Sequence, residues 1–219
     1  MRRRGSRKIS RNVQVDSLWK LETTTATDSI GGKDGVNNGC TVVSGKIGSG
    51  YNFSSSHIDL SVIKPDLTGS FSYGCWIKTS SANNFMAVLD NRGFGSKGSG
   101  IPGIYFTINT GSAWIEDING NVIEFGNLND LTDGLWHLVG FSWNISEGRL
   151  KTVIDGLVVS NRANPAMINS DTSSTKSLLV GKVGSSFYSG TMDEIFFKNG
   201  IITDSEFSTI WNNGNGINL

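Results

Sequence analysis

Hydrophobic and polar residues alternate along much of the chain, which is the pattern of β-strands with one buried face. Residues 135–145 show it most clearly: the odd-numbered positions are apolar except for His137, and the even-numbered positions are mixed. Because successive side chains of a strand point to opposite faces, one face should join a packed core, and the other should be partly wet or contact a ligand. We therefore expect a central strand here.

Similar short segments recur at spacings of roughly ten residues, separated by Gly, Asn, Asp and Ser. Between them, Asp155-Gly156 and Asn119-Gly120 predict β-hairpins, because glycine readily adopts the positive φ that tight turns require. The predicted class is all-β, a two-sheet antiparallel β-sandwich. Its strands are expected at residues 13–21, 58–63, 70–78, 85–90, 103–109, 113–118, 122–125, 136–145, 150–154, 177–180 and 192–198.

The C-terminal segment has a different, helical pattern. Thr203 and Glu206 have the spacing of a capping box, apolar residues follow at 207, 210 and 211, and Gly214 provides a stop signal. We expect one short amphipathic helix whose apolar stripe covers an edge or the open end of the sandwich.

The N-terminal segment differs from the rest of the chain in its charge. The first 12 residues hold six basic residues and no acidic one, which leaves 13 basic against 19 acidic residues in the rest, a net charge of −6. We divide the chain into an arm, residues 1–12, and a sandwich domain, residues 13–219. No apolar run of about 18 residues exists to span a membrane. The basic residues of the arm are Arg2, Arg3, Arg4, Arg7, Lys8 and Arg11.

The arm is too charged to pack and too short to fold alone, so it is expected to be disordered or to become ordered on a partner. Its charges suit contact with nucleic acid phosphates or with an acidic neighbouring subunit. No apolar segment follows the arginines, so the arm does not read as a secretory signal peptide.

A series of short motifs runs through the chain in a familiar order. It comprises Asp28-Ser29, Gly45-Lys46-Ile47-Gly48, Trp76-Ile77-Lys78, Asp133-Gly134-Leu135-Trp136, Asp155-Gly156, Asp193-Glu194-Ile195 and the terminal helix. In order and approximate spacing the series resembles the laminin-G-like jelly roll of the concanavalin A-like lectin/glucanase superfamily. The resemblance implies two sheets packed face to face, one concave and one convex. Function varies widely among proteins of this fold, so the resemblance implies no particular activity.

Enzymatic chemistry is not expected. Glycosidic cleavage needs carboxylates that project together, whereas Glu116-Asp117 and Asp193-Glu194 are adjacent pairs that point to opposite faces. A serine hydrolase would use one of the two histidines, but His137 lies on the apolar side of its strand and no nucleophile-elbow motif accompanies it. We interpret His137 as a core histidine satisfied by a hydrogen bond.

Two aspartates are candidate metal ligands. Alternation places Asp193 on the face of Ile195 and Phe197, where a carboxylate needs a partner. That partner is either a set of backbone amides or His137, or a Ca²⁺ ion to which Asp28 contributes from its Gly-rich turn. Several members of the superfamily bind calcium, so the resemblance keeps this alternative open, and no other cofactor is expected.

A ligand site is expected near Trp114, Asn91 and Arg92. Trp114 alternates with Ser112 and Glu116, which suggests a partly exposed face, and Asn91-Arg92 open the Gly-rich stretch 91–103. Aromatic and planar polar groups of this kind bind sugars. The alternative is that Trp114 is half-buried packing and that the stretch is a flexible linker.

Cys40 and Cys75 are predicted to be free, buried thiols. We interpret the whole chain as a non-catalytic binding and assembly module. The leading hypothesis is a virus or phage virion component, bound to other virion subunits or glycans and anchored by its arm. The alternatives are a stand-alone carbohydrate-binding lectin, extracellular or cytoplasmic, and a glycan-active enzyme. A homo-oligomer is compatible with each of them.

Overall fold

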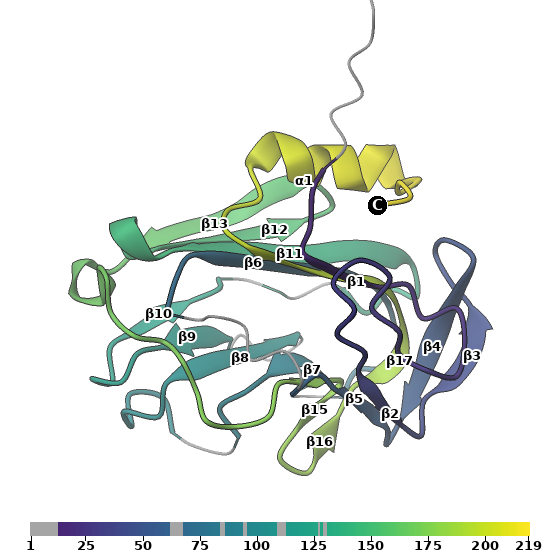
Figure 1. The fold of residues 1–219 in the computed structure, drawn as a ribbon, viewed down its shortest axis with the longest axis horizontal. Helices are drawn as coiled ribbons and strands as arrows, with labels where there is room; N and C mark the ends of the chain where they lie inside the picture. Colours follow the sequence, from purple (N-terminus) through teal and green to yellow (C-terminus); the bar gives the residue numbers. More distant parts are fainter. Residues whose placement is uncertain are drawn as a thin grey trace, which may run out of the picture.

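Two antiparallel β-sheets stack face to face in the computed structural model of the protein (Figure 1). The structure describes residues 13–61, 68–83, 86–93, 96–108, 113–126, 128 and 131–219. The basic arm lies outside these residues, so its predicted role stays a prediction. Among the described residues, no helix is long and apolar enough to cross a membrane.

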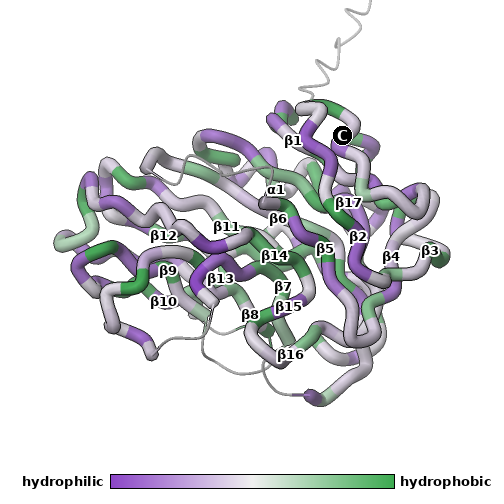
Figure 2. Tube along the Cα trace, turned by 60° about the horizontal axis from the view of Figure 1, so that its bottom comes forward, coloured by the Kyte–Doolittle hydropathy of each residue, from purple (hydrophilic) through white to green (hydrophobic). Residues whose placement is uncertain are grey.

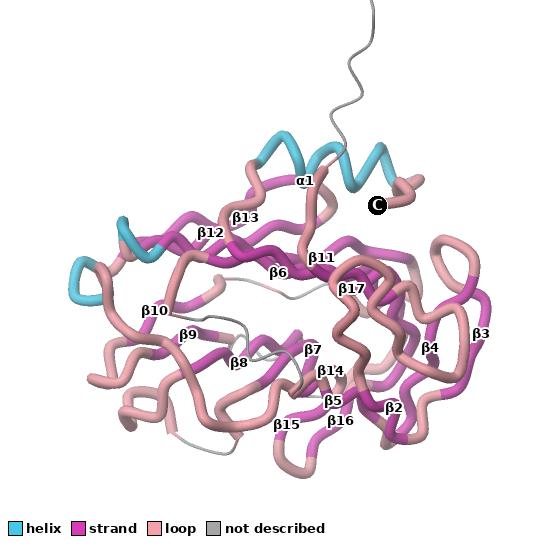
Figure 3. The backbone as a smooth tube through the Cα atoms, in the orientation of Figure 1, coloured by secondary structure: helices cyan, strands magenta, loops and turns pink. Residues whose placement is uncertain are grey.

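The first sheet has eight strands, and the terminal helix lies on its outer face (Figures 1 and 3). Strand β1 pairs with the C-terminal half of β17. The order of the other seven is β13 (Leu157–Ala163), β12 (Arg149–Ile154), β11 (Trp136–Asn144), β6 (Phe71–Lys78), β17 (Ser189–Asn199), β4 (Ser49–Ser54) and β3 (Thr41–Ser44), and β1 spans Ser17–Trp19.

The second sheet has seven strands, and a small two-stranded hairpin accompanies it. Its order is β10 (Val122–Glu124), β9 (Trp114–Glu116), β8 (Gly103–Ile108), β7 (Met86–Asp90), β14 (Leu179–Val180), β5 (His57–Asp59) and β2 (Val36–Asn38). The hairpin consists of β15 (Lys182–Val183) and β16 (Ser186–Phe187).

Strand β11 is central, as its alternation predicts, and pairs with β6 on one side and β12 on the other. Val139, Phe141 and Trp143 point between the sheets into the main core, and Leu138 points to the outer face. Figure 2 shows the corresponding concentration of hydrophobic segments along central strands such as β6, β7 and β14. Cys40 and Cys75 are buried free thiols, as expected.

Both predicted hairpins are present. Asp155 and Gly156 each adopt positive φ, 53° and 75°, between β12 and β13, as a two-residue hairpin turn demands. In the β9–β10 hairpin the Asp117 carboxylate accepts hydrogen bonds from the backbone N–H groups of Asn119 (3.0 Å) and Asn121 (2.7 Å). This side chain fixes the turn that surrounds Gly120.

Helix α1 (Asp204–Trp211) begins with the predicted capping box, in which Thr203 and Glu206 bond reciprocally to each other's backbone N–H. It ends at Asn212, in the left-handed conformation with φ 47°, two residues before the predicted Gly214 stop. A 3₁₀ turn, Asn212–Gly214, follows, and two others span Ile145–Glu147 and Pro165–Met167.

The expected position of the helix was wrong, because it covers the outer face of the eight-stranded sheet rather than an edge or an open end (Figure 3). Phe207 and Ile210 pack there against Leu138 and Phe196 in a second hydrophobic cluster. Trp76 of β6 stacks on Trp211, with ring centroids 5.1 Å apart.

Candidate binding groove

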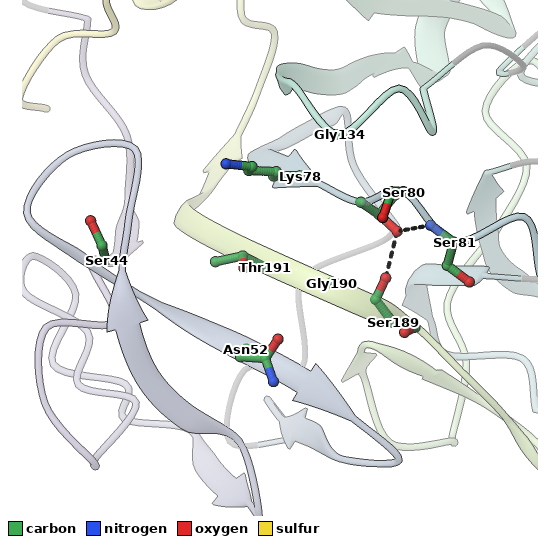
Figure 4. Close-up of a pocket in the computed structure, with 10 residues that line it drawn as sticks. Ser44, Asn52, Lys78, Ser80, Ser81, Gly134, Ser189, Gly190 and Thr191 are labelled. Atoms are coloured by element: carbon green, nitrogen blue, oxygen red, sulfur yellow. Dashed lines mark hydrogen bonds between the residues drawn. The ribbon is translucent and has the colours of Figure 1, made fainter.

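A polar groove of about 410 Å³ opens on the eight-stranded sheet (Figure 4). Strands β3, β4, β6 and β17 and the turn before β11 contribute to it. Nine of its ten residues are uncharged and either hydroxyl-bearing, amide-bearing or glycine. The lining residues are Ser44, Asn52, Lys78, Thr79, Ser80, Ser81, Gly134, Ser189, Gly190 and Thr191.

Strand register brings the central residues of the groove together from distant parts of the sequence. Thr191 of β17 pairs with Asn52 of β4 on one side and with Lys78 of β6 on the other. Directly paired residues project to the same face, so these three side chains form one row about 10 Å wide, since strands lie about 4.8 Å apart. The row continues into Thr41 at one end and half-buried Trp136 at the other.

Most polar side chains in the groove have no partner within the described part of the protein. Thr79 and Ser81 are the exceptions: the Thr79 hydroxyl donates to the Ser189 carbonyl (2.6 Å) and accepts from the Ser81 N–H (3.0 Å), and the Ser81 hydroxyl accepts from the Asn83 N–H (3.3 Å). The side chains of Asn52, Lys78 and Thr191 make none of the hydrogen bonds found among the described residues, and Asn52 and Thr191 are half-buried. Their donors and acceptors are therefore available to a ligand.

The backbone gives the groove its depth at Gly190. This residue has φ 145°, which disfavours any L side chain, and a Cβ there would collide with the Lys78 carbonyl and Thr79. Strands β17 and β6 therefore approach closely at the floor. A larger residue at position 190 would force strands β17 and β6 apart.

Lys78 is the single charged residue of the groove, and its side chain is exposed. It forms no ion pair with any described residue. In Figure 4 it extends toward the side of the groove on which Ser44 and Asn52 lie. The groove thus combines one cation with neutral hydrogen-bonding groups.

A second hollow of about 310 Å³ lies beside β10 and β13, and its charged residues are paired with one another. Glu124 there binds both Lys97 (2.5 Å) and Arg162 (3.1 Å). Because its charged groups satisfy one another, this hollow offers a ligand fewer free polar groups than the first.

The residues predicted from the sequence to bind a ligand are buried. Trp114 is 8% exposed, packs against Tyr105 with ring centroids 4.4 Å apart and planes tilted by 31°, and lies under the Arg92 guanidinium. Arg92 and Asn91 are 1% and 2% exposed, and the Asn91 side chain accepts from the Ile104 N–H (2.6 Å). The partial exposure expected of Trp114 is therefore wrong, and none of the three presents its side chain at the surface.

The same residues correct the interpretation of stretch 91–103 as a flexible loop. Arg92 forms a fully buried ion pair with Glu116 (2.8 Å), and its Nε donates to the Ile101 carbonyl (2.8 Å). Glu116 also accepts from the N–H groups of Gly98 (3.0 Å) and Gly100 (2.7 Å). The described part of this stretch is tied to the sheet by a buried charge network.

Asp28 lies at the start of a turn and Asp193 lies in strand β17, and the carboxylate of each accepts hydrogen bonds from backbone N–H groups. Asp28 accepts from Leu18, Ile30, Gly31 and Lys33 at 2.9–3.2 Å, and these N–H groups outweigh burial and lower its pKa. Asp193 accepts from Lys46 (2.7 Å), Ile47 (2.8 Å) and Glu194 (2.7 Å).

These hydrogen bonds are the backbone-amide partners that the first alternative expects for Asp193. No group of three or more His, Cys, Asp or Glu side chains among the described residues has a metal-binding arrangement. Burial nevertheless raises the pKa of Asp193 to about 6, because three N–H donors do not fully replace water around its charge.

His137 is hydrogen-bonded, as expected, but its location differs from the prediction. Its side chain is 14% exposed at the rim of the sheet and lies between Asp155 (Nδ1–Oδ2 2.8 Å) and Asp133 (Nε2–Oδ1 3.1 Å). The hydrogen bond to Asp155 is the main reason that the pKa of His137 is raised. Two carboxylates and no hydroxyl nucleophile surround the ring in these bonds.

The groove is not predictable from a local motif, because its residues come from separate segments of the sequence. The only signal is the alternation that places Asn52, Lys78 and Thr191 on outward faces of three strands. The neighbouring motif Gly45-Lys46-Ile47-Gly48 does appear in the sequence. In the structure, the backbone N–H groups of Lys46 and Ile47 donate to the Asp193 carboxylate.

Comparison with known proteins gives a family match and a consistent fold. A laminin-G-type sequence model of the concanavalin A-like lectin/glucanases superfamily matches residues 52–207. No curated protein matches the chain in sequence.

Several solved structures share the fold at low sequence identity. Domain 4 of AbnA, an extracellular arabinanase of Geobacillus stearothermophilus solved with arabinotriose, superposes with a TM-score of 0.64 at 16% identity, over 89% of this chain and 97% of that domain. The binding domain of Paraclostridial Mosquitocidal Protein 1 gives 0.71 at 12% identity, over 91% of this chain. The binding domain of botulinum neurotoxin DC, solved with rat synaptotagmin II, gives 0.64 at 11%, over 90% of this chain. The chain spans about half the length of the two toxin domains, 52% and 51%.

Proposed function

The chain belongs to the concanavalin A-like lectin/glucanases superfamily, and we propose that it is a non-catalytic carbohydrate-binding module whose site is the polar groove of β4, β17 and β6. The observation that carries this proposal is the row Asn52–Thr191–Lys78. Three polar side chains from neighbouring strands lie at one level, and none of them has a side-chain hydrogen bond or ion pair with another described residue.

Carbohydrates need such an arrangement because each ring presents several hydroxyl groups that lose water on binding. An asparagine amide offers a donor and an acceptor in one plane, and a threonine hydroxyl does both in a smaller space. Fixed on adjacent strands, they replace water at little cost in conformational entropy. The additional hydroxyls of Ser44, Ser80 and Ser189 extend this polar surface along the groove.

The comparisons agree with a binding role at the level of fold. The arabinanase domain, which is in complex with arabinotriose, is a sandwich of this fold that binds an oligosaccharide. Its identity to this chain is low, so the position of the site here rests on the groove itself.

The absence of catalysis is part of the proposal. A glycosidase needs two carboxyl groups beside the scissile bond, and no carboxylate is among the ten residues of the groove. The buried acids Glu116 and Asp117 are engaged in the Arg92 network and the β9–β10 turn. The virion association predicted from the basic arm gains no support from the comparisons, which favour the carbohydrate-binding alternative.

Binding of a broad oligosaccharide panel to the full chain tests the proposal, with affinities measured by calorimetry for each hit. Asn52→Ala should weaken binding about tenfold, because one lost hydrogen-bonding group is worth about 1 kcal/mol or slightly more. Thr191→Val should act in the same direction. Asn38→Ala, at an exposed asparagine on β2 of the other sheet, is the matched control and should change nothing. Binding that both groove variants retain at full strength would place the site elsewhere.

A further inference from the structure

We infer that the groove selects a sugar that carries a single carboxylate, such as a uronic acid, and that Lys78 is the residue that recognises it. This inference rests on the proposed function and names the class of ligand. The observation behind it is one ammonium group, without an ion-pair partner among the described residues, at the end of a row of neutral hydrogen-bonding side chains.

The state of Lys78 differs from that of the other cations near the surface of this sheet. Lys151 binds Asp204 (2.8 Å), Lys198 lies 3.7 Å from Glu206, and Arg149 binds Glu147 (2.8 Å). Lys46 donates to the Gly214 carbonyl (2.5 Å) and lies over the Trp76 ring. Lys78 has no comparable contact within the described part of the chain, so its charge is available to a ligand.

The neighbours of Lys78 determine what kind of anion fits. On β17 it faces Thr191, and beyond Thr191 lies Asn52, about 10 Å from Lys78 across two strand spacings. A ligand that pairs its carboxylate with the ammonium group therefore meets a hydroxyl and then an amide. That sequence of partners suits a polyhydroxylated ring with one acidic substituent.

Densely charged polyanions fit less well. Nucleic acids bind through many cations at once, whereas the groove holds one. Outside the basic arm the chain has a net charge of −6, which repels a polyanion that extends past the groove. A ligand with isolated negative charges and many hydroxyls avoids this penalty.

The test uses pairs of probes that differ only in one acidic group: neutral oligosaccharides that end in a single glucuronate, galacturonate or mannuronate residue, and the carboxyl-reduced form of each. For the pair that binds, wild-type protein should prefer the acidic member about tenfold, the effect of one charge-assisted hydrogen bond. Lys78→Met should abolish the preference, so that the acidic member binds no more tightly than the reduced member. Lys78→Arg should restore it.

Lys176→Met is the matched control, because Lys176 is an exposed lysine near β14 of the opposite sheet and forms no ion pair among the described residues. It lowers the net charge equally, so a preference lost in both variants would reflect overall charge and overturn the inference. Equal binding of both members by wild type would overturn the inference and leave the carbohydrate-binding proposal standing. Failure of every acidic and neutral oligosaccharide to bind would overturn both.

Discussion

The buried carboxylate of Glu194 should make the protein more stable in mildly acidic solution than in alkaline solution. Glu194 lies at a bulge of β17, where its backbone has φ 45°, and its side chain is 1% exposed. Neither of its carboxylate oxygens has a hydrogen-bond partner in the part of the chain that the structure describes. Burial, and then the charge of Asp193, raise the pKa of Glu194 from the ordinary 4.5 to about 7. The change that tests this is Glu194→Gln, which keeps the shape and removes the charge.

The expected magnitude follows from the pKa. Because the folded state holds the proton more tightly than the unfolded chain, the contribution of Glu194 to stability is full below pH 4.5 and is lost as pH rises through about 7. Each pKa unit corresponds to about 1.4 kcal/mol, so the loss by pH 8 is about 3 kcal/mol. Glu194→Gln should therefore raise the free energy of unfolding by about 3 kcal/mol at pH 8 and by about 0.5 kcal/mol or less at pH 4.5.

Urea denaturation of wild type and variant at a series of pH values between these limits measures the difference directly, since titrating groups that do not interact with Glu194 contribute equally to both proteins. Glu147→Gln is the control, because Glu147 is exposed and its ion pair with Arg149 should contribute less than about 1 kcal/mol at any pH. A Glu194→Gln protein that is less stable at pH 8, or shifted equally at every pH, would refute the reasoning. It would mean that the ionised carboxylate has a stabilising partner.

Three further predictions concern the framework of the sandwich. Glu116→Gln leaves the buried Arg92 guanidinium without its carboxylate and should cost about 3–5 kcal/mol in urea denaturation; a cost under about 1 kcal/mol would show that the pair is not a structural anchor. NMR titration should give His137 a pKa above 6.5, and Asp155→Asn should lower that pKa. The stability that His137 provides is full below pH 6.5 and is lost as pH rises through the raised pKa. A measured pKa below 6.5 would contradict the geometry. Thr203→Ala removes the N-cap of α1 and should cost about 1 kcal/mol by thermal denaturation, with an unchanged value arguing that packing alone holds the helix.

Features that depend on neighbours in the sequence were predictable. Alternation in 135–145 identified the central strand β11, Asp155-Gly156 identified a hairpin, and Thr203 with Glu206 identified the start of the helix. Each is a local rule of backbone geometry or hydrogen bonding. The motif series also pointed to the correct superfamily, which residues 52–207 match.

Features that depend on tertiary pairing were not predictable. Strand β3, Thr41–Ser44, is exposed at every residue and so shows no alternation, and β4 contains a glycine that weakens its pattern. The alternation of Trp114 with Glu116 predicts a partly exposed face. Arg92 forms an ion pair with Glu116, which allows Glu116 and Trp114 to be buried. The row Asn52–Thr191–Lys78 exists only through strand register, which joins residues more than a hundred positions apart.

The most direct measurement of the central claim is an NMR titration of the labelled protein with an oligosaccharide that it binds. The account predicts that backbone amide signals of residues 78–81, Gly134 and 189–191 shift together as the sugar is added, because these residues line the groove. Shifts confined to residues 96–103 and Trp114, with groove signals unchanged, would contradict it and return the site to the opposite sheet.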